Sequence, residues 1–193
     1  MSMPKDRRVG LAPSLFLITL LYFGLGFISI LFGLLAFVCM GIPFILLARH
    51  RKKLWCSSYC PRASLLMKTG TRKKTRTIPR QFSDGKLKTV MLWYFGLNLL
   101  FITGSTIQVA MGNMASMEYI RLFIAIPLVS LPQLITVEAP SAVMHLSYRL
   151  YSMMLSSTIL GIVLSRIYRP RIWCAICPVG TLSNALLKGG KER

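Results

Sequence analysis

The chain has 193 residues, which suits a single domain, and 54% of them are hydrophobic while only 15% are charged. Ordinary soluble domains carry about 25% charged residues, and long apolar runs like those seen here are typical of bilayer-spanning segments. The net charge of +19 would suit a nucleic-acid binder, but the basic residues gather beside the apolar runs, with 13 of the 24 Lys and Arg between Arg49 and Lys88. Such clusters mark the cytoplasmic side of membrane proteins, so we expect a lipid bilayer and no nucleic acid as partner.

The first apolar run, Leu15–Ala48, is too long for the hydrophobic region of a cleavable signal peptide, and we interpret it as retained membrane structure. As one helix it would extend about 51 Å, against a hydrocarbon core of about 30 Å. A tilted span with an interfacial extension and a short hairpin both satisfy this length. The residues at which a break or kink is expected are Gly24, Gly26, Gly33, Gly41 and Pro43.

A basic loop at 49–88 separates this run from three further apolar segments, at about 89–111, 119–137 and 142–165, and a basic tail follows at 166–193. Three full crossings would place the two basic regions on opposite sides of the membrane. The middle segment contains Arg121, Pro127 and Pro132, which suit a re-entrant or interfacial segment. We therefore predict an all-α membrane protein, a small bundle of about four transmembrane helices in a single domain covering residues 1–193.

Four of the five cysteines lie in the basic, predicted cytoplasmic segments: Cys56, Cys60, Cys174 and Cys177. Because that compartment keeps thiols reduced, we expect metal ligands rather than structural disulfides. Cys39 lies within the first apolar run, where a cysteine is most simply a small buried hydrophobe.

The cysteine pairs belong to an internal repeat. Trp55-Cys-Ser-Ser-Tyr-Cys-Pro61 and Trp173-Cys-Ala-Ile-Cys-Pro178 each follow an apolar span and a basic stretch, and each continues into a short amphipathic segment. Two similar units on one membrane face predict a pseudo-twofold arrangement that brings the two cytoplasmic motifs together.

Four thiolates from two such pairs fit a [4Fe–4S] cluster, a [2Fe–2S] cluster or a tetrahedral zinc ion. We favour a single [4Fe–4S] cluster, because a structural zinc stabilises small domains that lack a core, whereas membrane helices already provide packing here. The neighbouring Lys and Arg would stabilise an anionic cluster and attract an acidic electron carrier. Two alternatives stay open: a thiol/disulfide transporter of reducing equivalents, and a zinc-stapled structural or assembly protein.

These motifs resemble those of the NapH/NosR family of membrane iron–sulfur proteins, over most of residues 45–188. The resemblance implies that Cys56, Cys60, Cys174 and Cys177 bind the cluster at the cytoplasmic face of the inner membrane of the cell. It also implies electron transfer from quinol or a cytoplasmic donor towards an extracytoplasmic acceptor. The second motif departs from the family pattern, with two residues between its cysteines instead of three.

A further departure is that these residues include no C-terminal ferredoxin domain of the NapH type and no flavin domain of the NosR type. A lone cluster does not carry electrons across a whole bilayer, so we expect the chain to work with other membrane or peripheral redox subunits. Because the sequence contains no substrate-processing constellation, we expect a subunit that is not catalytic by itself. The partner would supply a quinone, flavin or haem site, and a cytoplasmic ferredoxin or flavoprotein is a possible electron carrier.

Overall fold

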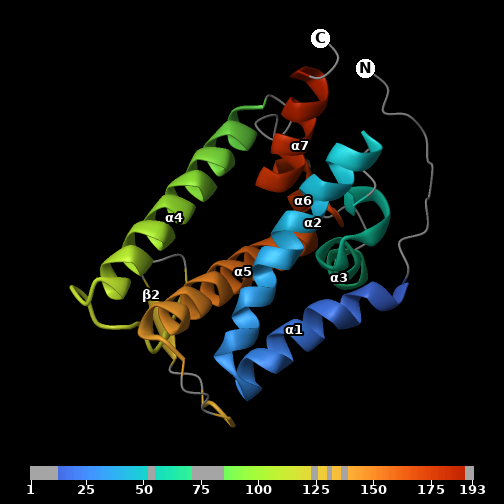
Figure 1. Cartoon of the computed structure of the whole chain (residues 1–193). Coiled ribbons are helices and arrows are strands. Elements are labelled where there is room, and N and C mark those ends of the chain that lie inside the picture. The colour runs from blue at the N-terminus through green and yellow to red at the C-terminus, as the bar shows by residue number, and fades with distance from the viewer. Residues whose placement is uncertain are drawn as a thin grey trace, which may run out of the picture.

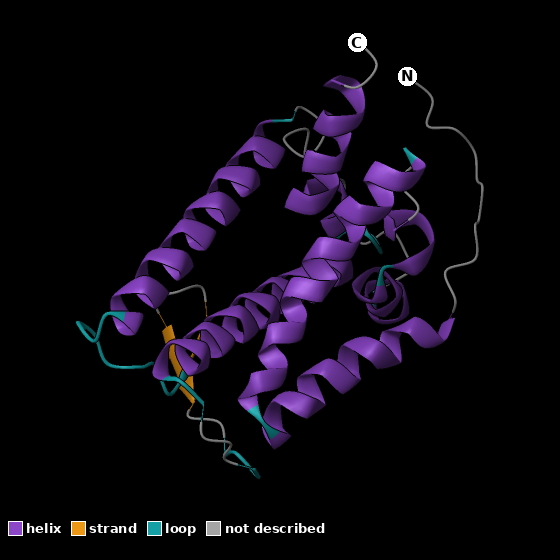
Figure 2. Ribbon diagram, in the orientation of Figure 1, coloured by secondary structure: helices purple, strands orange, loops and turns teal. Residues whose placement is uncertain are grey.

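The computed structural model describes residues 13–51, 55–70, 85–122, 126–129, 132–135 and 139–189 of this chain (Figures 1 and 2). Residues 52–54 and 71–84 of the basic loop and residues 190–193 of the basic tail lie outside the described residues. The helices are α1 (Phe16–Ile28), α2 (Leu35–His50), α3 (Pro61–Thr69), α4 (Lys86–Ala110), α5 (Ser141–Ile167), α6 (Ile172–Ile176) and α7 (Pro178–Gly189). The shorter turns are η1 (Pro13–Leu15), η2 (Ile30–Leu34) and η3 (Trp55–Tyr59), and the strands are β1 (Ile120–Leu122) and β2 (Ile126–Val129).

Three of the described helices are long and apolar enough to cross a membrane, which fits a membrane protein. They cover Ile30–His50, Lys86–Ala110 and Ser141–Ile167. The fourth apolar helix, α1, has 13 residues and would reach about 20 Å, short of the hydrocarbon thickness of about 30 Å. The structure therefore contains three candidate spans and a shorter apolar helix where we predicted about four spans.

The first apolar run bends at Ser29, whose backbone is extended between α1 and η2. A bend of this kind leaves backbone groups without helical partners, and a distant segment supplies them. The Ile30 N–H donates to the Gln133 side-chain oxygen at 2.7 Å, and the Ile135 N–H donates to the Ile28 carbonyl at 3.0 Å. The run is therefore two arms that meet at a bend (Figure 1), and neither Gly41 nor Pro43 interrupts α2.

The structure is 81% helical, as the predicted all-α class requires, and the middle apolar segment forms one short antiparallel pair, β1–β2. Its register pairs Ile120 with Val129 and Leu122 with Ile126. A proline within this stretch, Pro127, removes a backbone donor and disfavours a helix. The Arg121 N–H instead donates to the Ser152 hydroxyl of α5 at 3.2 Å, which fixes β1 against that helix.

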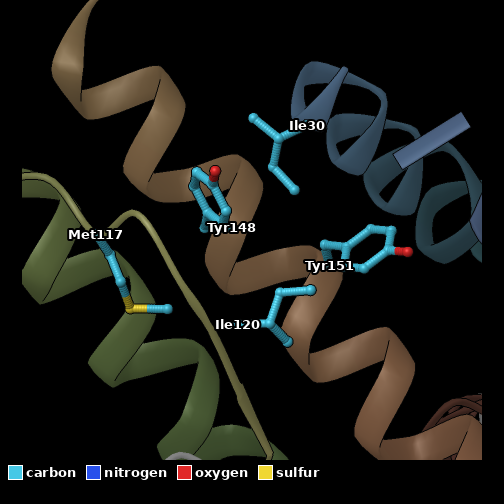
Figure 3. Packing of buried hydrophobic residues seen from close by; sticks show 5 residues of the cluster. All are labelled: Ile30, Met117, Ile120, Tyr148 and Tyr151. Carbon is cyan, nitrogen blue, oxygen red and sulfur yellow. The ribbon is translucent and has the colours of Figure 1, made fainter. Parts of the chain in front are cut away.

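Helix α5 lies at the centre of the bundle, and 44% of its most hydrophobic stretch is buried. Figure 3 shows Tyr148 and Tyr151 of α5 among Ile30 of η2 and Met117 and Ile120, which lie in the segment that leads into β1. The Tyr151 hydroxyl donates to the carbonyl of Phe23 in α1 at 3.0 Å. These contacts hold the bend, β1 and α5 together.

The two cysteine motifs lie at the same end of this bundle. The first motif follows α2 and the second follows α5, and α7 packs against both α2 and the start of the chain's next span, α4 (Figure 1). Helix α4 therefore begins at this end of the bundle, and α5 ends at it.

Candidate metal centre

The first cysteine pair stands on a turn that follows α2. Helix α2 ends at His50, and Arg51 then adopts a left-handed conformation with φ of 50°. The π turn η3 carries Cys56, and Cys60 is the extended residue that precedes α3. Pro61 occupies the first position of α3, where its missing N–H costs no helical hydrogen bond.

The second pair has the same order of elements. Arg171 is left-handed, with φ of 67°, the short helix α6 carries Cys174, and Cys177 precedes Pro178 at the start of α7. The carbonyl of the second cysteine accepts a bond from the residue four positions on in both motifs, from Ser64 at 3.2 Å and from Thr181 at 2.9 Å.

The unequal spacing of the two motifs has a structural explanation. A π turn closes over one more residue than an α turn does. The first motif, with three residues between its cysteines, uses the π turn η3, and the second, with two, uses the α-helical turn α6. Both second cysteines then occupy equivalent places before a proline-initiated helix.

All four cysteines line one cavity of about 140 Å³, which we call the central cavity. Residues from α2, α3, α4 and α5, together with β1 and the residues that flank the cysteines, form the rest of its wall. The Cys174 thiol is close enough to those of Cys60 and Cys177 for their charges to interact. The two motifs are thus brought together across more than a hundred residues of sequence.

A fifth cysteine also lines the central cavity. Cys39 of α2 interacts electrostatically with Cys60 and Cys177. From its place in an apolar run, Cys39 was expected to be a small buried hydrophobe, and its place in the wall of this cavity was not predicted. One sequence feature is consistent with this place: Cys39 and Pro43 are four positions apart, so they share a helix face, and both line the cavity.

Two arginines hold the motifs in place. The Arg171 guanidinium donates to the Cys56 carbonyl at 2.9 Å and also to the Cys174 sulfur, so it links the two motifs directly. Arg62 lies with its guanidinium 5.9 Å from the ring centre of Trp173 and interacts with Cys60. Trp173 itself is only 5% exposed, so it packs in the core rather than in an interfacial belt.

Two of the site thiols, those of Cys60 and Cys174, have a raised pKa, which favours their neutral form. Burial raises the pKa of Cys60, opposed by N–H donors at Ala63 and Arg62 and by the Arg62 charge. Burial, with the Cys60 sulfur as the next cause, raises the pKa of Cys174 to about 11. A bound metal centre supplies the positive charge that stabilises thiolates, and its binding would release protons.

The four thiols that line one cavity fit an iron–sulfur cluster as a donor set. Tetrahedral zinc needs all its sulfurs at about 2.3 Å from one point. In a [4Fe–4S] cluster each thiolate binds a different iron, so the sulfurs surround a larger object. The residues that would hold it are Cys56, Cys60, Cys174 and Cys177.

His145, the one histidine on a predicted span, is not part of this site. It is 1% exposed, its Nδ1 accepts from the Met117 N–H at 3.2 Å, and its Nε2 lies 3.0 Å from the Ser105 hydroxyl. Both ring nitrogens therefore have protein partners, and the ring anchors the connection after α4.

The sequence matches a family described as a 4Fe-4S binding domain over residues 32–77 and again over residues 151–193. Each match contains one cysteine pair; the first also contains all of α2, and the second contains the later part of α5. These matches support an iron–sulfur protein and suggest a role in electron transfer. Searches of curated proteins and of solved structures gave no match.

Proposed function

We propose that this chain is a membrane electron-transfer subunit that carries one [4Fe–4S] cluster, bound by Cys56, Cys60, Cys174 and Cys177. A bound cluster supplies a one-electron carrier. The chain's own residues supply the four thiols, a largely apolar enclosure and nearby cations. The observation that carries the proposal is that two motifs distant in sequence line one cavity, each of them within a separate match to a 4Fe-4S binding domain.

The proposed position of the cluster is the cytoplasmic face of the inner membrane. The motif end of the bundle carries the dense basic segments, among them Arg49, Arg51, Arg166 and Arg169 beside the ends of α2 and α5. Short loops rich in Lys and Arg stay in the cytoplasm. A pseudo-twofold relation between the units at residues 32–77 and 151–193 accounts for the matching motif geometry.

We further propose a NapH/NosR-type relay, in which a cytoplasmic donor or a quinol reduces the cluster and a partner redox subunit oxidises it. A single cluster at one membrane face does not span the bilayer, so the partner has to provide the next carrier. A basic surface around the motifs suits an acidic ferredoxin or flavoprotein.

The two alternative functions fit the site less well. Thiol/disulfide exchange needs an accessible thiolate of low pKa, whereas burial raises the pKa of both Cys60 and Cys174. A zinc staple stabilises a small domain that lacks a core of its own, whereas membrane helices already provide packing here.

The proposal is tested by electron paramagnetic resonance on anaerobically purified protein in detergent. We expect dithionite to produce a reduced [4Fe–4S] signal of about one spin per chain. The variant Cys174→Ser should lose most of it, while Cys39→Ser, which removes a thiol from the same cavity but not a proposed ligand, should keep it. A signal that is absent from the unaltered protein, or equal in both variants, would refute the assignment.

A further inference from the structure

The central cavity contains more positive charge than its cysteines explain. Three arginines line it: Arg62 of α3, Arg121 of β1 and Arg149 of α5. Among the described residues no Asp or Glu lines the cavity, and Glu118, the one side-chain carboxylate in this part of the chain, is exposed. Arginine within a membrane bundle is costly unless an anion or a hydrogen-bond acceptor compensates it.

The three arginines differ in their partners: Arg62 lies beside a proposed cluster ligand, Arg121 donates to the Tyr119 hydroxyl, and Arg149 has an unpaired nitrogen. Arg62 interacts with Cys60, so a net anionic cluster would compensate it. Arg121 and Arg149 lie close enough for their charges to repel each other. The Nε atom of Arg149 is buried without a hydrogen-bond partner.

The surroundings of this arginine pair indicate what it would bind. Arg121 is held on β1 by its backbone bond to Ser152, and its guanidinium packs 4.9 Å from the ring centre of Tyr119. The guanidinium fork matches an oxyanion with two acceptor oxygens. The neighbouring wall is apolar and includes Ile102, Met117 and Met153, which suits the hydrocarbon part of an amphiphile.

We propose that Arg121 and Arg149 form a binding site for a phosphate group in the central cavity, between the cysteines and β1. The phosphate belongs either to the headgroup of a phospholipid, whose chains contact the apolar wall, or to a free phosphate ion. Neither arginine belongs to a cysteine motif, so binding of phosphate and retention of the cluster can be measured separately.

The site is tested by thermal unfolding of delipidated, anaerobically purified protein. Three probes are added in turn: phosphatidylglycerol, diacylglycerol as the matched lipid without phosphate, and inorganic phosphate. The variants are Arg121→Gln, Arg149→Gln and the charge-conserving Arg149→Lys. Arg166→Gln is the control, since Arg166 is an exposed arginine of the same helix.

We expect phosphatidylglycerol, but not diacylglycerol, to stabilise the unaltered protein and the Arg166→Gln control. The glutamine variants should bind about tenfold more weakly or worse, and Arg149→Lys should lie between, because lysine keeps the charge and loses the fork. Stabilisation by inorganic phosphate at similar concentration would identify the free ion as the source. No response to either phosphate probe, or an undiminished response in the glutamine variants, would overturn the proposal. Iron content, measured on each sample, reports separately on the cluster.

Discussion

Arg171 is the residue that connects the two cysteine motifs. Its guanidinium donates to the Cys56 carbonyl at 2.9 Å and to the Cys174 sulfur, while its own backbone is left-handed. A non-glycine residue in this conformation is uncommon and is maintained only when its surroundings require it. We interpret Arg171 as a positioning residue for the metal centre.

Replacing Arg171 by glutamine should weaken cluster retention, because the charge-assisted bonds to both motifs are lost. Groups that orient metal ligands typically contribute about 10- to 100-fold in metal affinity. The rate of iron loss to a chelator under anaerobic conditions measures the effect. Arg169→Gln, an exposed arginine two residues earlier, is the control. Equal rates for the two variants would show that Arg171 does not position the site.

The raised pKa of Cys174 predicts how the cluster-free protein responds to alkaline pH. The folded chain keeps this thiol protonated up to about 11, against 9.0 for the ordinary thiol. The folded state therefore binds more protons between these values, and stability falls as pH rises through them, by up to about 1.4 kcal/mol per pH unit. Unfolding of the cluster-free protein from pH 8 to pH 11 measures this slope. It should be shallower in Cys174→Ala, and an identical slope would contradict the assignment.

Among single residues, the sequence predicted the role of those that belong to a contiguous motif. The cysteine pairs, their flanking Trp and Pro, and their basic neighbours are contiguous, so their meeting at one site was predictable. The place of Cys39 was not, because a single cysteine on an apolar helix gives no pattern that distinguishes a cavity wall from a lipid contact. Arg121 and Arg149 were visible as isolated charges, but their pairing depends on tertiary contacts between β1 and α5.

At the scale of elements, the arm that enters α2 is packed closely against α5. A Cβ atom added at Gly33 would lie 2.6 Å from the carbonyl oxygen of Ser147, a backbone atom that cannot move aside cheaply. A Cβ atom added at Gly41, in the same span, would meet nothing within 4 Å.

Gly33→Ala should therefore destabilise the protein by about 1–3 kcal/mol through overpacking. Gly41→Ala should be neutral or should stabilise by up to about 1 kcal/mol, because alanine is the better helix former. Thermal unfolding in detergent compares the two. A Gly33→Ala variant as stable as Gly41→Ala would show that the α2 arm and α5 are not in this contact.

The elements also show why some boundaries were not predictable. The first run was expected to break at a glycine or proline, yet it bends at Ser29 because Gln133 and its neighbours, a hundred residues later, satisfy the exposed backbone groups. The middle segment was expected to be unsuited to crossing, and its prolines support that view. Its pairing as β1 and β2 follows from packing on α5, which no local pattern contains.

At the scale of the whole molecule, the cysteine motifs and the connection after α4 lie at opposite ends of the bundle. The parity argument from sequence had placed both basic regions on one side, and the structure brings the ends of α2 and α5 to one end. The side of the membrane that this end faces follows only from the charge distribution.

Two exposed asparagines allow this orientation to be measured. Asn184 lies on α7 at the motif end, and Asn113 lies just after α4 at the other end. A membrane-impermeant maleimide should label Asn184→Cys only in inside-out vesicles and Asn113→Cys only in intact spheroplasts, with the unaltered chain as the blank. The reverse pattern would place the metal centre on the extracytoplasmic side.

The central claim is that cysteines from both motifs bind one cluster in a single chain. The most direct measurement is the content of iron, acid-labile sulfide and zinc in anaerobically purified protein. The account predicts about four irons and about four sulfides per chain, with no zinc. One zinc per chain without iron would contradict it, as would iron retained in full after both Cys174 and Cys177 are replaced by serine.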